Sequence, residues 1–198
     1  MPDSARPKIS GRQRVGGAGD PEVFCADEQN EVPVDLPRWQ QLALDVLVAE
    51  RVRGLAELSL LFVAEAEITE LNERYMGVVG PTDVLSFPID AVEADVVLQS
   101  PAANIGPDRS PPDLGDMPLL LGDVVICPRV AQRQSSEHAG TLDDELALLV
   151  VHGVLHVLGF DHAEPAERDA MRARELELLQ AHHWHGPVPL GFHQEQPD

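Results

Sequence analysis

The feature that most constrains this chain is an apolar segment at residues 146–158, which reads LALLVVHGVLHVL. Two histidines are its only polar side chains, and a helix that is apolar on nearly all sides is a buried helix. His152 and His156 are four residues apart, so their imidazoles lie on one face of that helix, one turn from each other. Because buried imidazoles need bonding partners, the segment predicts histidines that bond to the surrounding chain or to a ligand.

A third histidine follows at a distance that lets it reach the first two. Gly159 can end the helix in a left-handed conformation, after which the chain can turn back and bring His162 to the same point. Three imidazoles with a fourth position open are the ligand set of a catalytic zinc ion. We therefore expect His152, His156 and His162 to bind one Zn²⁺ per chain, although nickel, copper and cobalt also suit such a site.

Two structural interpretations of these histidines stay open. They can be core histidines that bond to backbone carbonyls, without any metal. They can also form a closed structural zinc site in which Asp161 is the fourth ligand. Closed sites are usually rich in cysteine, and here Cys25 and Cys127 are isolated and far from the histidines in sequence.

The histidine spacing also matches the H-x-x-x-H-x-x-G-x-x-H frame of the metzincin metalloproteases. Those proteases carry a glutamate directly after the first histidine as the general base, whereas this chain has Gly153 there. A zinc metalloprotease-like hydrolase remains an alternative. A glutamate from elsewhere, such as Glu145 or Glu164, would restore the base if it reached the metal.

Length and composition predict one folded domain with polar ends in this chain of 198 residues. Residues 1–30 are rich in Gly, Pro, Arg and Asp and are expected to be a disordered tail. Residues 31–182 form the expected domain, with 91–117 as an exposed, proline-rich acidic loop. Residues 183–198 are expected to be a C-terminal tail.

Hydrophobic periodicity and helix breakers predict both helices and strands in this domain. We expect helices over 37–53, 65–76, 128–139, 141–158 and 164–182, and strands over 58–63, 84–87 and 119–127, with a further strand that could start at Val23.

Charge and cysteine content narrow the classes of function. The net charge of −20 argues against a broad non-specific grip on nucleic acid, but it leaves room for a locally basic cleft. The N-terminus lacks the apolar stretch of a secretory signal, and no run is long enough to span a membrane. Two separated cysteines imply no disulfide framework, so we expect a cytoplasmic protein that does not contact a membrane.

Three parts of the sequence, in order, resemble the YbeY family of bacterial rRNA maturation factors. The histidine segment HGVLHVLGFDH at 152–162 resembles the family signature. LNERY at 71–75, followed by TDVLSFP at 82–88, resembles the family's L-N-x-x-Y and T-D-V-L-S-F block, and LGDVVI at 121–126 resembles its L-G-D-I-x-I strand.

This resemblance implies an α+β fold in which helices pack on a small mixed β-sheet. It implies a zinc-dependent, single-strand endoribonuclease that matures the 3′ end of 16S rRNA and monitors ribosome quality. It also implies that His152, His156 and His162 bind the metal. The expected partners are ribosomal RNA and the small ribosomal subunit, with a ribosomal protein or an assembly GTPase as further candidates.

The chain departs from the family pattern at one position near the expected site. Many members carry an arginine directly after the aromatic residue of the L-N-x-x-Y block, and this chain has Met76 there. Arg74 lies on a different helical face. We expect either that another arginine, such as Arg129 or Arg133, holds the phosphate or that RNA cleavage is weak.

The candidate catalytic residues are His152, Asp161 and Asp83. Zinc held by three imidazoles lowers the pKa of a bound water to about 7, although the ribose 2′-OH is an equally open choice of nucleophile. Asp161 is the nearest carboxylate in sequence, either as proton acceptor or as the partner that fixes an imidazole tautomer. Asp83 and Ser86 either line the cleft or cap a turn and pack in the core.

A non-enzymatic alternative is a zinc-stabilised assembly factor that binds the small subunit and affects rRNA indirectly. The net charge of −20 favours contact through a protein partner over contact with bare RNA. Salt dependence of RNA binding distinguishes the two.

Overall fold

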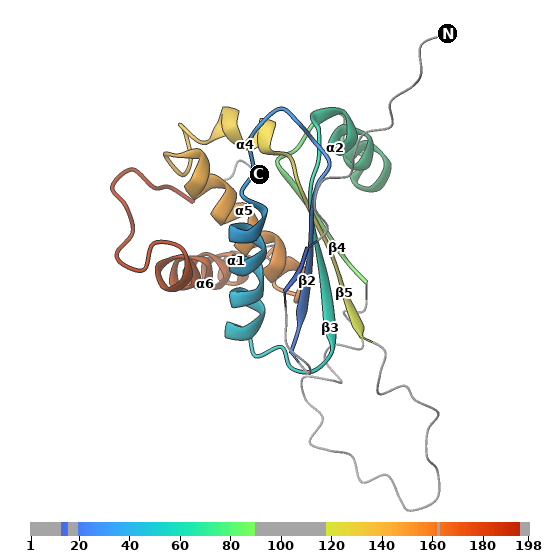
Figure 1. Cartoon of the computed structure of the whole chain (residues 1–198). Helices are drawn as coiled ribbons and strands as arrows, with labels where there is room; N and C mark the ends of the chain where they lie inside the picture. Colours follow the sequence, from blue (N-terminus) through green and yellow to red (C-terminus); the bar gives the residue numbers. More distant parts are fainter. Residues whose placement is uncertain (1–12, 16–19, 90–117, 162, 195–198) are drawn as a thin grey trace, which may run out of the picture.

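The computed structural model describes residues 13–15, 20–89, 118–161 and 163–194, and Figure 1 shows their arrangement. His162 and the expected loop at 91–117 lie outside the described residues. Within the described part, every helix is too short or too polar to cross a membrane.

A mixed sheet forms the centre of the fold, with strand order β1-β2-β3-β5-β4. The strands are β1 (Gln13–Val15), β2 (Glu22–Asp27), β3 (Ala56–Phe62), β4 (Val84–Pro88) and β5 (Leu119–Ile126). The central strands β2, β3 and β5 run parallel, whereas β1 and β4 pair antiparallel at the two edges. This arrangement confirms the expected α+β class with a small mixed sheet.

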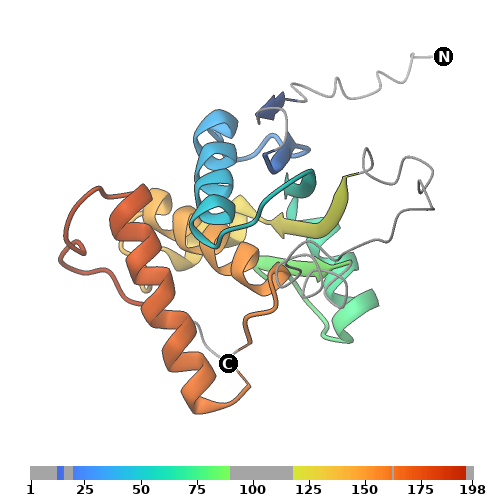
Figure 2. The same cartoon turned by 90° about the horizontal axis from the view of Figure 1, so that it is seen from below.

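Helices lie on both faces of the sheet. The helices are α1 (Leu36–Ala49), α2 (Glu65–Leu71), α4 (Pro128–Gln134), α5 (Leu142–Val157) and α6 (Pro165–His182), and a π-helical turn, η1 (Asn72–Met76), continues α2. Helices α1, α5 and α6 cover one face, and α2 lies on the other (Figure 1). The view from below shows α5 between α6 and the sheet (Figure 2).

Helix α5 is the buried helix that the apolar segment predicts. It contacts α1, α4, α6 and the strands β4 and β5, so nearly every side of it meets another element. The Thr141 hydroxyl accepts a hydrogen bond of 3.1 Å from the backbone N–H of Asp144 and so caps the helix start. Three acidic residues in the first turn, Asp143–Glu145, favour the positive end of the helix dipole.

The folded part extends beyond the expected range 31–182 at both ends. Residues 22–27 fall in the expected disordered tail but form β2, in agreement with the strand that we noted could start at Val23; β2 pairs with β3 and buries Val23 and Cys25. The strand has few residues in a polar stretch, so composition averaged over a longer window obscured it.

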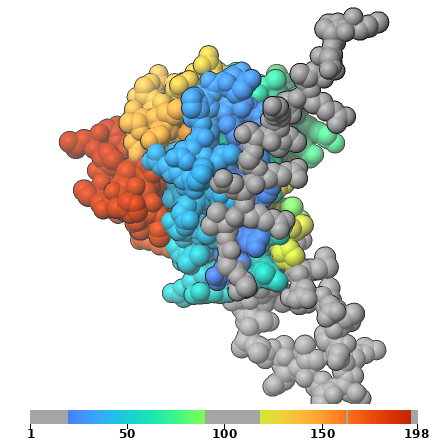
Figure 3. All heavy atoms as spheres, in the orientation of Figure 1, coloured from blue at the N-terminus to red at the C-terminus, as the bar shows by residue number. Residues whose placement is uncertain are grey.

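The expected C-terminal tail is also partly folded. Trp184 and Phe192 pack against the main core and against each other, with ring centroids 4.8 Å apart. Figure 3 shows the C-terminal residues, in red, against the rest of the molecule. The described chain after α6 therefore belongs to the domain as far as Gln194.

Candidate active site

A cleft of about 640 Å³ opens beside α5 and is lined by residues of β4, α5, α6 and the segment before β4. His152 and His156 both line it, as do Asp83 and Ser86. The structure therefore brings together four side chains that the sequence singled out, from segments that are far apart in the chain.

The two imidazoles of α5 face each other across one helical turn. Their Nε2 atoms are 3.1 Å apart. The His156 Nδ1 lies 2.9 Å from the backbone carbonyl oxygen of Phe160, which can only accept a hydrogen bond. His156 therefore carries its proton on Nδ1, which leaves a lone pair on its Nε2.

Glu175 of α6 sets the tautomer of the other imidazole. Its Oε1 lies 2.8 Å from the His152 Nδ1, and its Oε2 accepts a hydrogen bond of 2.8 Å from the Gln194 amide. A glutamate carboxylate accepts at both oxygens, so the His152 ring is the donor here, from Nδ1. Its Nε2 then also presents a lone pair, directed at that of His156.

This pair of nitrogens fits a metal ion. Two lone pairs at 3.1 Å repel each other unless a cation lies between them. Two ligands at about 2.0 Å from a tetrahedral zinc are separated by about 3.3 Å, close to the distance observed. No third His, Cys, Asp or Glu joins the pair among the described residues, and His162 is not one of these.

Glu175 and Gln194 were not among the site residues predicted from the sequence. Glu175 is an acidic residue on the apolar side of α6, near the buried Met171 and Leu178. A carboxylate in an apolar stripe signals a buried partner, and that signal was available in the sequence. Gln194 lies in the segment expected to be a tail, and no local pattern places it at the site.

Gly153 marks a close approach between α5 and the sheet. A Cβ atom at this position would lie 2.5 Å from the Val124 Cγ1 atom and 3.3 Å from the Ser86 Oγ atom. The Ser86 hydroxyl donates a hydrogen bond of 3.2 Å to the Gly153 carbonyl. The position that holds the catalytic glutamate in metzincins therefore has no room for a side chain here.

The other two glutamates considered as protease bases have structural partners. Glu145 is buried, and it accepts hydrogen bonds from the Ala139 N–H and pairs with the His138 ring. Burial raises the pKa of Glu145 above its ordinary value. Glu164 caps the first turn of α6. Neither lines the cleft, so the packing opposes the metalloprotease alternative.

The two candidate aspartates occupy different environments. Asp83 lines the cleft, and its Oδ1 accepts hydrogen bonds from the Val84 N–H at 2.9 Å and from the Thr82 hydroxyl. It therefore both caps the turn before β4 and faces the histidines' cleft. Asp161 follows α5, is exposed, and accepts a hydrogen bond from the Ala163 N–H.

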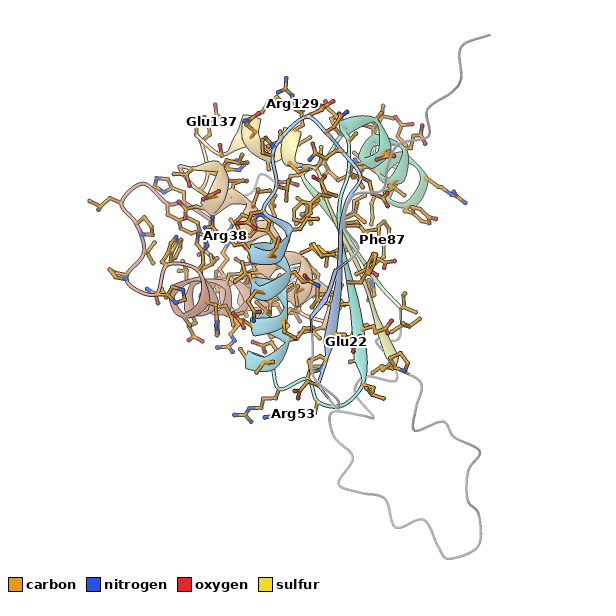
Figure 4. The ribbon with its side chains drawn as sticks, viewed as in Figure 1. Glu22, Arg38, Arg53, Phe87, Arg129 and Glu137 are labelled. Atoms are coloured by element: carbon orange, nitrogen blue, oxygen red, sulfur yellow. The ribbon has the colours of Figure 1, made fainter. Side chains whose placement is uncertain are left out.

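Met76, which stands where many family members carry an arginine, is among the residues that line the cleft. The two arginines expected as substitutes do not line it. Arg133 forms two hydrogen bonds with the Glu65 carboxylate, and these bonds hold the pKa of Glu65 below its ordinary value. Arg129 lies near Glu31 and points away from the sheet at the α4 end of the molecule (Figure 4).

The fold and the site define an α+β protein in which a buried helix presents two imidazole nitrogens to a cleft. A sequence model of the family described as "Endoribonuclease YbeY" matches residues 24–183. The chain belongs to this family of endoribonucleases, which are hydrolases of ester bonds. The resemblance read from the sequence is thereby confirmed, and so is the expectation of an endoribonuclease-type enzyme.

Curated relatives named "Endoribonuclease YbeY" match most of the chain. The protein from Frankia casuarinae is 44% identical over 83% of this chain and 75% of its own length. The protein from Thermobifida fusca is 46% identical over 77% of this chain and 90% of its own length. A solution structure of a Thermotoga maritima protein aligns with 82% of this chain and 91% of its own, at 23% identity and a TM-score of 0.48.

Proposed function

We propose that this chain is a zinc-dependent endoribonuclease that cleaves single-stranded RNA in the 3′-end maturation of 16S rRNA and in ribosome quality control. The observation that carries the proposal is the pair of imidazole Nε2 atoms, of His152 and His156, that lie 3.1 Å apart in the cleft of a member of an endoribonuclease family. We place the protein in the cytoplasm.

His152 and His156 would hold one Zn²⁺ per chain, with His162 as the third ligand. Zinc bound there would polarise a phosphoryl oxygen and make a water molecule more acidic. The Glu175 carboxylate and the Phe160 carbonyl keep the two Nδ1 atoms protonated, so both Nε2 atoms stay available as ligands.

Asp83 is the better placed of the two candidate proton acceptors. It lines the cleft with the histidines, whereas Asp161 lies on the exposed turn after α5. A carboxylate in the cleft can take the proton of an attacking water or ribose hydroxyl, either through a direct hydrogen bond or through one bridging water molecule. Asp161 retains the role of a second candidate.

The proposed partners are ribosomal RNA and the small ribosomal subunit. The net charge of −20 gives the free protein little attraction for bare RNA, so a protein contact on the particle would bring it to its substrate. A ribosomal protein or an assembly GTPase fits that role. The same charge favours, as a second candidate, a zinc-stabilised assembly factor that does not itself cut RNA.

Cleavage of a small-subunit rRNA precursor by purified protein tests the proposal. The protein is stripped of metal, reconstituted with zinc, and assayed on the precursor and on a denatured protein substrate. RNA cleavage that needs zinc and is lost in Asp83→Asn supports the nuclease and its proposed acceptor. Precursor left intact in the presence of zinc would favour the assembly factor, and proteolysis would favour the metalloprotease.

A further inference from the structure

Two arginines of α6 line the same cleft as the histidines. Arg168 and Arg172 are both half-buried lining residues. They are four residues apart, so they lie on one face of the helix and about 6 Å apart along its axis. Of the described residues that line the cleft, these two are the ones with a permanent positive charge.

Within the described part of the chain, the ion pairs do not use these two guanidinium groups. Among the described residues, the salt bridges of arginine involve other positions, namely Arg38 with Asp143, Arg129 with Glu31, Arg133 with Glu65, and Arg174 with Glu50 and Glu177. In a chain with a net charge of −20, two arginines that line a cleft and form no salt bridge with a described residue are a distinct local feature.

Four acidic residues lie within four positions of the two arginines, and none of them forms a salt bridge with either arginine among the described residues. Glu164 is the N-cap residue of α6, Glu167 accepts a hydrogen bond from the Glu164 backbone N–H, and Asp169 is exposed. Glu175, three residues after Arg172, bonds to His152 and Gln194. Both arginines line the cleft, and Asp83 is the one other carboxylate besides Glu175 among its described lining residues.

We propose that Arg168 and Arg172 form a phosphate-binding subsite that holds the backbone of single-stranded RNA beside the imidazole pair. This inference rests on the proposed function. A guanidinium group presents its N–H donors as a planar fork that matches two phosphate oxygens. The spacing of the pair lets it bind one phosphate together or two successive ones. The subsite supplies from α6 the charge that Met76 does not supply from η1.

Binding of a labelled single-stranded 2′-O-methyl RNA to the full chain, followed by anisotropy at several salt concentrations, tests the subsite. The variant is Arg168→Gln/Arg172→Gln. The matched control is Arg51→Gln/Arg53→Gln, which removes the same charge from exposed positions after α1 that do not line the cleft (Figure 4 labels Arg53). Arg168→Lys/Arg172→Lys keeps the charge and removes the fork.

We expect the glutamine variant to bind about tenfold more weakly than wild type, and the control to bind within about twofold. Loss of two single-strand phosphate contacts lowers the slope of log Kd against log salt by about 1.4. Wild type therefore loses about sevenfold more affinity than the variant between 50 and 200 mM salt. The lysine variant keeps the slope, and it tests the subsite if the glutamine variant does not fold.

Two outcomes overturn the inference and are distinguishable. If wild type binds and cleaves RNA and the glutamine variant matches the control in affinity and slope, the subsite is wrong and the nuclease proposal stands. If wild type neither binds nor cleaves RNA, both are wrong.

Discussion

Replacement of Glu175 should weaken metal binding more than it weakens the fold. The carboxylate is almost fully buried, with a side chain 5% exposed, and it accepts from the His152 ring at 2.8 Å and from Gln194 at 2.8 Å. Glu175→Gln keeps the shape of the side chain but removes its charge. The His152 ring then loses the partner that fixes its tautomer and raises its basicity as a ligand.

The expected loss is about 10- to 100-fold in zinc affinity, which corresponds to about 1.4–2.7 kcal/mol. Competition with a coloured chelator measures the affinity, and thermal unfolding of the metal-free protein measures the fold separately. We expect a smaller effect on the metal-free fold, because Glu175→Gln keeps an amide oxygen that can accept a hydrogen bond from the His152 Nδ1. Glu177→Gln is the matched control, because Glu177 is on the same helix and pairs with Arg174 instead. Equal zinc affinity in wild type and Glu175→Gln would refute the assigned role.

Three further predictions follow from the packing and the titrating groups. Gly153→Glu should lower the free energy of unfolding, measured with urea, by at least about 3 kcal/mol, because Val124 and Ser86 occupy the space and the charge would be buried. A folded variant of unchanged stability would contradict the close packing. Burial alone would raise the pKa of Asp144, but hydrogen bonds from Thr141, Trp184 and His183 hold it below its ordinary value of 3.8. These hydrogen bonds therefore stabilise the fold above that pH, and their contribution is lost in acid. The difference in Tm between wild type and Asp144→Asn should shrink below about pH 4. A difference that stays constant with pH would be evidence against this contribution. Burial raises the pKa of Cys25 to about 12, so a thiol reagent at pH 8 should label this residue only after unfolding, and rapid labelling of native protein would show that the thiol is accessible.

Local sequence patterns were sufficient for the elements whose burial is continuous along the chain. The helix expected over 141–158 is α5 at Leu142–Val157, and the strand expected over 119–127 is β5 at Leu119–Ile126. Apolar periodicity, an N-cap and flanking breakers all agree in these segments. The expected helix over 65–76 has the right extent, but its last turn is the π-helical η1, which no pattern of side chains signalled.

The parts that sequence analysis missed depend on contacts between distant segments. Strand β2, for which the sequence indicated only a start at Val23, is stabilised by its pairing with β3. Gln194 reaches the site because Trp184 and Phe192 pack on the core. The arginine pair of α6 was not predicted as part of the site, because only the apolar positions of this helix were used to interpret it. Its position at the cleft follows from how α6 packs against α5, which the local sequence does not determine.

The zinc content of purified protein tests the central claim most directly, with His156→Ala compared with wild type and with His185→Ala. His185 is an exposed histidine whose Nδ1 bonds to the Ala181 carbonyl, so its removal is a control for histidine content. We expect about one zinc per chain in wild type and in the control, and none in His156→Ala, with RNA cleavage lost in parallel. Equal zinc in all three proteins, or RNA cleavage that persists in His156→Ala, would contradict this expectation.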